Sequence, residues 1–264
     1  MASSTHIGYI TSISPHGYPL TKDRPKDEIK PKDLVLIIEG DDSEYKIFKL
    51  PIKMPVIKAA IMPIMISAWI ILKKYYNLKG NDKVIIDIND TEGESPSIFS
   101  RAIVDIGKYM GIHVLNISNK NDQKIIETIS VKGESGSGGG IKLGITNSSA
   151  SARTMTRLLA PNGVVVICDN DIIETTQKIN YEKIYFPIAA SIFTNIAIVG
   201  FSFNQTATIK PDWVQDGING IEDMMNNNFF QYIESYEEKD FKKGLDFIER
   251  TGKSVVLYSS TRDE

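Results

Sequence analysis

The sequence has one cysteine and three histidines among 264 residues, and this scarcity argues against two kinds of site. Cys168 has no second cysteine to pair with, which excludes an internal disulfide and favours a reducing compartment. The histidines are scattered and no cysteine cluster accompanies them, so we expect no metal site.

An excess of positive charge is also missing. The chain carries 30 basic and 33 acidic residues, a net charge of -3, and we therefore expect no nucleic-acid partner. Residues 1–17 contain no lysine or arginine and no long apolar run. This segment is typical of neither a secretory signal nor an arginine-rich mitochondrial presequence.

One apolar run, Met54–Leu72, has nearly the length of a membrane span and a single charge, Lys58. Pro55 and Pro63 interrupt it, and Lys58 would have to lie in hydrocarbon. A helix buried on most sides of a soluble fold gives the same pattern, so we expect no transmembrane span.

Hydrophobic periodicity predicts a β-rich beginning followed by alternating strands and helices. We expect strands at 8–13, 34–39 and 45–50, a helix at 56–76, strands at 84–88, 114–117, 142–146, 164–168 and 196–203, helices at 97–110, 120–129 and 150–160, a turn at 161–163, helices at 214–235 and 239–250, and a last strand at 254–258. This alternation predicts the α/β class, with a Rossmann-like, doubly wound parallel sheet.

The expected division of the chain follows from this order. We expect a reduced β domain at residues 1–55, a Rossmann-like domain at 56–205, and C-terminal helices and a strand at 206–264 that complete the fold.

The first strand-to-helix turn of such a sheet normally binds the pyrophosphate of a dinucleotide. Its glycines allow a tight turn and let backbone N–H groups approach the phosphates. Here the turn runs from Asp87 to Ser97 with one glycine, Gly93, and four carboxylates. Carboxylates repel a pyrophosphate, and they stabilise the N-terminus of a helix through its dipole. We therefore interpret the turn as a solvated loop rather than an anion site.

Two further strand ends were candidates for cofactor contacts. Lys120 follows the second strand of the sheet, where a basic residue would meet the 2′-phosphate of NADPH, although a lone surface lysine is usually only solvated. Asp169, Asn170 and Asp171 follow the strand at 164–168 and are acidic where a cofactor loop favours glycine.

Taken together, these segments resemble the medium-chain dehydrogenase/reductase superfamily, and most closely its mitochondrial 2-enoyl thioester (enoyl-CoA/ACP) reductases. The resemblance covers nearly the whole chain, and its motifs are individually short: Gly8–Ile13, Ile29–Leu36, Asp42–Lys46, Ser67–Leu72, Leu78–Ile85, Ile103–Ile112, Ser149–Gly163, Phe193–Phe203 and Leu245–Leu257. The resemblance implies that the reduced N-terminal β domain is GroES-like.

The departures from the family are concentrated at its functional positions. Ile98 and Ser100 stand where the resemblance places the paired cofactor glycines. The stretch that holds the catalytic tyrosine in enoyl reductases has no counterpart before Gly8, so we assign no catalytic residue. If the protein is an active NADPH-dependent reductase, the candidate cofactor contacts are Gly93, Ser97, Ser100 and Lys120.

Three hypotheses follow for function. The favoured one is a catalytically degenerate reductase, without a cofactor, that acts as a structural or accessory subunit with other protein subunits or as a homodimer; the resemblance implies a mitochondrial location. The second is an NADPH-dependent 2-enoyl thioester or quinone-type reductase with a divergent loop. The third is a small-molecule sensor that uses the former cofactor cleft without chemistry.

Overall fold

The computed structural model describes residues 5–9, 33–39, 45–51, 54, 58–59, 61–88, 97–132, 140–168, 195–227, 229–230, 233–237 and 254–258. The chain divides into two compact units. Unit 1 comprises Met1–Ile66 together with Phe203–Glu264, and unit 2 comprises Ser67–Ser202. The expected boundaries near residues 55 and 205 stay a prediction.

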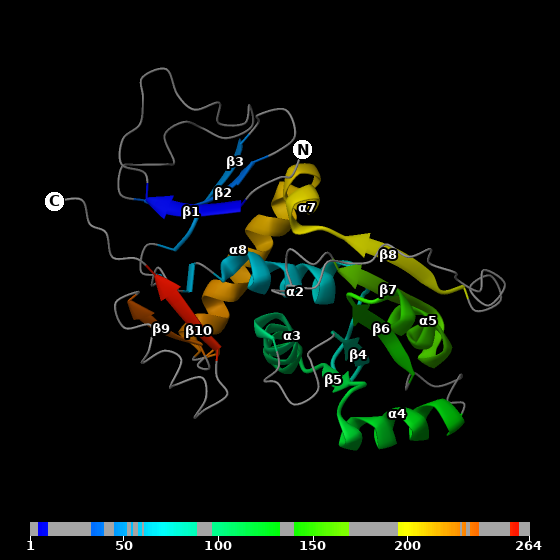
Figure 1. Ribbon diagram of the computed structural model, residues 1–264. Coiled ribbons are helices and arrows are strands. Elements are labelled where there is room, and N and C mark those ends of the chain that lie inside the picture. The colour runs from blue at the N-terminus through cyan, green and yellow to red at the C-terminus, as the bar shows by residue number, and fades with distance from the viewer. Residues whose placement is uncertain are drawn as a thin grey trace. The chain divides into compact units, whose positions relative to one another are not determined.

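Unit 2 is built on a five-stranded parallel sheet with the strand order β5-β4-β6-β7-β8. Its strands are β4 (Lys83–Asp87), β5 (His113–Asn116), β6 (Ile141–Thr146), β7 (Leu159–Cys168) and β8 (Ala197–Phe201). The connecting helices are α3 (Ile98–Tyr109), α4 (Lys120–Lys132) and α5 (Ser149–Leu158). Helix α3 lies on one side of the sheet, and α4 and α5 lie on the other (Figure 1). The predicted α/β, doubly wound sheet is therefore confirmed.

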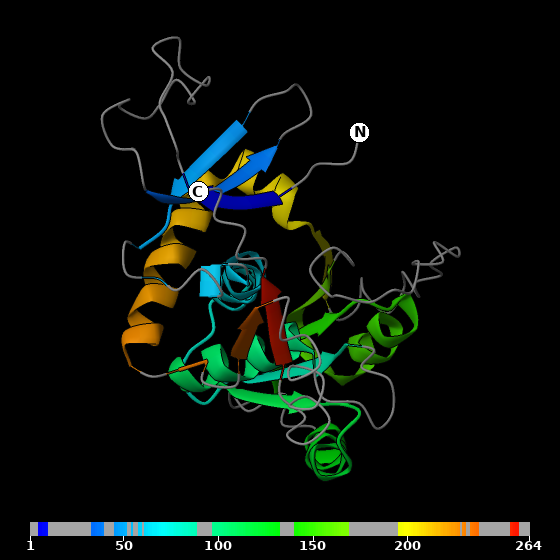
Figure 2. The same cartoon turned by 60° about the vertical axis from the view of Figure 1, so that its left-hand side comes forward.

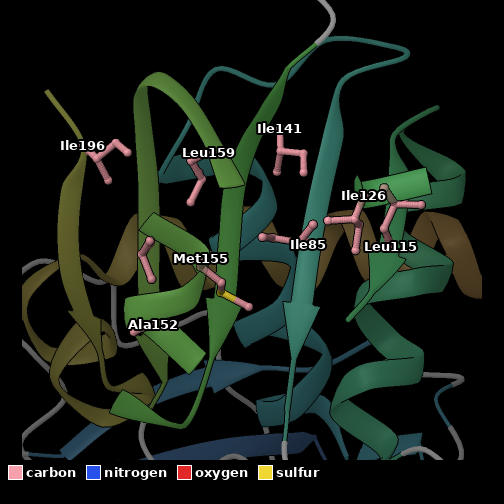
Figure 3. Close-up of a cluster of buried hydrophobic side chains, with 9 residues drawn as sticks. Ile85, Leu115, Ile126, Ile141, Ala152, Met155, Leu159 and Ile196 are labelled. Carbon is pink, nitrogen blue, oxygen red and sulfur yellow. The ribbon is translucent and has the colours of Figure 1, made fainter. Parts of the chain in front are cut away.

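The central strands are apolar on both faces because helices cover both. One core cluster joins the sheet to α4 and α5 (Figure 3). Ile85 and Ile141 come from the sheet, Ile126 from α4, and Ala152 and Met155 from α5. On α3, buried side chains recur at helical spacing, which gives that helix its own apolar face.

The strand order identifies which part of a dinucleotide-binding sheet is present. In the full arrangement the order is 3-2-1-4-5-6, and the strands of unit 2 correspond to 2-1-4-5-6. Only residues 133–140 join α4 to β6. A third strand followed by a crossover helix needs at least about 10–12 residues, and in the described part of the chain no strand lies beyond β5 in this sheet. The strand order reverses between β4 and β6, which makes their carboxyl ends the expected ligand-binding edge.

Unit 1 contains a small antiparallel sheet with the order β1-β2-β3, formed by β1 (Thr5–Tyr9), β2 (Leu34–Glu39) and β3 (Tyr45–Lys49). It matches the reduced β domain expected at the N-terminus. The same unit contains α7 (Phe203–Ile209), α8 (Pro211–Asn226), and a parallel pair, β9 (Ile233–Glu237) and β10 (Ser254–Tyr258), which lie side by side in Figure 2.

Helix α2 (Met62–Lys74) contains residues 62–72 of the apolar run, and it begins later than the expected residue 56 and ends before the expected residue 76. Pro63 lies in its first turn, where a backbone N–H is not needed for helical bonding. In the described part of the chain, no helix is both long and apolar enough to span a membrane.

The structure also corrects predicted boundaries of two strands and a turn. Strand β1 occupies residues 5–9 rather than 8–13, and residues 10–13 lie outside the described ranges. The turn expected at 161–163 lies within β7, because Leu159 already pairs with Ile141 and the extra residues bulge before Val164 pairs with Leu143. Strand β8 ends at Phe201 rather than at 203, since Phe203 begins α7.

The C-terminal region contains the largest error. The helix expected at 214–235 ends at Asn226, and residues 233–237 form β9 instead. Phe230 has a φ of 61°, a left-handed conformation that no helix interior adopts. The helix expected at 239–250 lies outside the described residues, whereas the expected strand at 254–258 is confirmed as β10.

Candidate functional site at the switch point

The candidate site is the edge of the unit 2 sheet where β4, β5 and β6 end. Asp87 closes β4, Asn116 closes β5 and Thr146 closes β6. Parallel strands bring these carboxyl ends to one edge, next to the first turns of α3, α4 and α5. The polar groups at this edge decide whether a dinucleotide fits.

The first turn of α3 is capped by its own serines. Ser97 is the N-cap residue, and its Oγ accepts a hydrogen bond from the Ser100 backbone N–H at 3.1 Å. The Ser97 hydroxyl also lies 3.0 Å from Ser100 Oγ. Ser100 is 2% exposed, and the side chains of Ile98 and Phe99 between the two serines are buried as well. The amide of Ser100 is thus already bonded within the protein.

A second set of hydrogen bonds ties the end of β5 to the sheet and to α4. Ser118 Oγ lies 3.4 Å from Asp87 Oδ1, which links β5 to the end of β4. The Ser118 backbone N–H donates to Asn116 Oδ1 at 2.9 Å. The Asn116 backbone N–H donates in turn to Asp122 Oδ2 at 2.9 Å. Polar groups that could meet an adenosine ribose here are bonded to one another.

The end of β6 follows the same pattern. Thr146 is fully buried, and its Oγ1 accepts a hydrogen bond from the Ser148 backbone N–H at 3.0 Å. Ser148 then caps α5 by accepting from the Ser151 N–H at 3.5 Å. The hydroxyl groups at this strand end therefore accept hydrogen bonds from the neighbouring backbone.

The predicted cofactor contacts fall into two groups in the structure. Ser97 and Ser100 are brought together, but as a helix cap. Lys120 is the exposed first residue of α4, on the helix whose first turn borders the end of β5. Gly93 and the segment 169–171 lie outside the described residues.

Sequence reasoning missed Asp122, whose side chain reaches back to β5. The signal was present in the spacing, since Asn119 precedes Asp122 by three residues at the start of a helix, a typical capping arrangement. Asn119 Oδ1 accepts from the Asn121 N–H at 2.8 Å. Within the described ranges, no group of three or more histidine, cysteine, aspartate and glutamate residues is arranged to hold a metal ion.

No protein-family model matches the sequence, and no curated protein matches it in a sequence search. Solved structures do match. An alcohol dehydrogenase zinc-binding domain protein from Burkholderia ambifaria is similar with a TM-score of 0.62 and 10% identity, over 96% of this chain and 82% of that chain. The mitochondrial 2-enoyl thioester reductase heterodimer from Candida tropicalis is similar with a TM-score of 0.52 and 14% identity, over 85% and 73%.

A third similar structure is an Etr1p mutant in complex with NADP and crotonyl-CoA, with a TM-score of 0.53 and 15% identity over 85% of this chain and 73% of that chain. Identities this low establish the fold alone. The chain has the fold of the medium-chain dehydrogenases/reductases and of the enoyl thioester reductases among them, as the sequence resemblance implied.

Proposed function

We propose that this protein is a reductase-fold subunit without cofactor chemistry, which serves a structural or accessory role in a larger assembly. The observation that carries the proposal is the bond between Ser97 Oγ and the Ser100 N–H at the start of α3. In a dinucleotide-binding fold, the N–H groups of this turn face the pyrophosphate. Here the Ser97 side chain, in place of a pyrophosphate, accepts a hydrogen bond from one of these N–H groups.

The charge and packing of the same edge support the proposal. Asp87, a carboxylate, ends β4 directly before the phosphate-binding turn and would repel a pyrophosphate. Ser100 is buried. Because this residue is a serine and not a glycine, its side chain opposes the close approach of a phosphate to the backbone. Residues with these properties do not fit a bound dinucleotide, and we derive no catalytic step from them.

The hydrogen bonds at the end of β5 also support a protein without a bound dinucleotide. An acidic side chain at this position holds the ribose of NAD in dinucleotide-binding folds. Asp122 is the acidic residue nearest in sequence to the end of β5, but it accepts from the Asn116 backbone instead. A ligand would have to break that bond in order to use the carboxylate.

Strand β8 offers an edge through which such a subunit could join partners. It is the last strand of the sheet among the described residues, and its sequence AIVGF contains no charge and no proline. Edges that must stay unpaired usually carry such residues. A heterodimer among the solved neighbours supports assembly through protein subunits or through a second copy, and its mitochondrial description supports the same location for this chain.

A second candidate function is an NADPH-dependent 2-enoyl thioester or quinone-type reductase. The observation that favours it is the exposed Lys120 at the start of α4, near the strand end where NADPH would present its 2′-phosphate. The neighbour that contains NADP and crotonyl-CoA supports the same alternative.

Calorimetric titration of the folded protein with NADPH at modest salt separates the two. The structural proposal expects no binding tighter than about 1 mM. Binding near about 1 μM, together with turnover of an enoyl thioester, would replace it with the reductase. A ligand that raises the melting temperature without turnover would support a sensor. Isolation of the native protein as a lone monomer would contradict the structural role.

A further inference from the structure

The amino edge of the unit 2 sheet, where its strands begin, carries an excess of positive charge. Helices that connect parallel strands run back to this edge, so the last turns of α3 and α5 lie beside the first residues of the strands. Basic residues occupy these turns, the strand starts and the loop before β4: Lys79, Lys83, Lys108, Lys142 and Arg157. In the described part of this edge the one carboxylate is that of Asp82, and Asp105 lies a turn earlier on α3. The chain as a whole has a net charge of -3, so the excess is local.

Two of these lysines, Lys79 and Lys108, flank one contact between backbone segments. The Asn81 N–H donates to the Gly111 carbonyl oxygen at 2.8 Å, and the Gly111 N–H donates to the Lys108 carbonyl oxygen at 3.1 Å. A Cβ atom on Gly111 would lie 3.8 Å from Cα of Gly80, the residue after Lys79. Both lysines are exposed. Backbone contacts therefore hold the two lysines on one small area of the surface.

The exposed side of α3 adds apolar surface next to these lysines. Val104 is 43% exposed and Tyr109 is 38% exposed. Val104 and Lys108 are four residues apart and share one face of the helix, and Tyr109 directly follows Lys108. The Tyr109 ring packs against Trp69 of α2, with 6.4 Å between the ring centroids. The edge therefore combines positive charge with an exposed valine and a tyrosine whose ring is supported from within the fold.

The helix dipole accounts for only part of this charge. Cations in the last turn of a helix are stabilised by its dipole, which explains Lys108 and Arg157 without a partner. Lys79, Lys83 and Lys142 lie outside the helices, in a loop and at the starts of two strands. Neighbouring cations repel one another, and an acidic partner relieves that repulsion. A negatively charged partner is therefore the occupant that complements this edge.

We propose that this amino edge, centred on Lys79, Lys108 and Tyr109, binds an acidic segment of a partner protein. Carboxylates of the segment pair with the exposed lysines, and its apolar side chains pack on Val104 and Tyr109. A nucleic acid would use the charge but not the exposed valine, which favours a protein segment. This assignment rests on the accessory role proposed above, because that role requires a protein partner. NADPH titration tests that role at the opposite edge of the sheet, so either conclusion can fail without the other.

The probe is a synthetic peptide of glutamate and leucine, labelled for fluorescence anisotropy and titrated with the full chain. At a salt concentration of about 0.1 M, charges more than about 10 Å apart are largely screened, so the measurement reports local contacts. We expect Lys79→Glu combined with Lys108→Glu to bind the peptide at least about tenfold more weakly than wild type. The matched control, Lys120→Glu with Lys124→Glu, makes the same change of charge at exposed positions in the first turns of α4. It should bind within about twofold of wild type.

A second comparison separates a protein segment from any polyanion. We expect Val104→Ser to bind the glutamate–leucine peptide at least about threefold more weakly, and to bind a peptide of glutamate and serine like wild type. Wild-type binding of a single-stranded oligonucleotide as tightly as the peptide would overturn the proposal. Equal weakening in the α4 control, or no peptide binding at about 1 mM, would do the same. If the double glutamate variant does not fold, Lys79→Gln with Lys108→Gln replaces it, and unchanged peptide binding in that variant would contradict the proposal.

Discussion

A Cβ atom on Gly107 in α3 would lie 2.5 Å from Cγ2 of Val114 in β5. Contacts this short do not occur, so α3 approaches the sheet at a distance that only glycine permits. The Gly107 contact belongs to the packing of helix against strand and not to cofactor binding.

Gly107→Ala should therefore lower the free energy of unfolding. Overpacking costs about 1–3 kcal/mol, and the better helix propensity of alanine returns up to about 1 kcal/mol. We expect a net loss of about 1–2 kcal/mol, measured by urea denaturation. Gly80→Ala is the matched control, because nothing lies within 4 Å of its added Cβ and its stability should change little. Adding Val114→Ala to Gly107→Ala should restore part of the loss.

Ser97→Ala tests the role of the serines at the switch point. Loss of this N-cap should cost about 1 kcal/mol of stability. Ser148→Ala, at the cap of α5, should cost less because its bond to the Ser151 N–H is longer, at 3.5 Å against 3.1 Å. Calorimetry should detect no NADPH binding in either variant. Tight binding in the wild type that disappears in Ser97→Ala would make this serine a cofactor contact instead.

Lys120→Ala addresses the reductase alternative directly. Lys120 is exposed, so its removal should change stability by less than about 0.5 kcal/mol. If the structural role holds, NADPH at about 1 mM leaves the melting temperatures of the wild type and of Lys120→Ala unchanged. A wild-type preference for NADPH over NADH that vanishes in Lys120→Ala would instead favour the reductase.

Gly200→Lys tests β8 as an assembly edge. A Cβ atom at Gly200 would have nothing within 4 Å, so the fold should tolerate a side chain there, while a lysine on an edge strand opposes pairing. We expect wild-type protein to sediment as an assembly and Gly200→Lys as a smaller species of unchanged melting temperature. Gly80→Lys adds the same charge where there is also open space, and it should assemble like wild type.

The sequence predicted the sheet of unit 2 well because its strands are apolar, buried segments with clear breaks between them. Strands such as β4 and β6 were placed within one residue. The segment that forms β9 was predicted in part as helix, because this strand is defined by its pairing with β10, a partner about twenty residues further along. Local periodicity does not contain that pairing.

The sequence predicted which residues lie at the candidate site, but it did not predict the hydrogen bonds between them. Asp87 and Ser97 were placed correctly at the strand-to-helix turn. The links from Ser118 to Asp87 and from Asn116 to Asp122 depend on which strands are neighbours and on where α4 begins. The link from Ser118 to Asp87 could not be derived before the strand order was known, whereas the spacing of Asn119 and Asp122 already indicated where α4 begins.

The short link between α4 and β6 also bears on how the chain folds. Strand β4 must meet β6, its neighbour in the centre of the sheet, before the core cluster can form. An additional strand and helix between them would lengthen the loop that this encounter closes, and each doubling of a loop adds about 0.6 kcal/mol of closure entropy. The short link between α4 and β6 thus brings the two halves of the sheet nearer along the chain, which lowers contact order and favours faster folding.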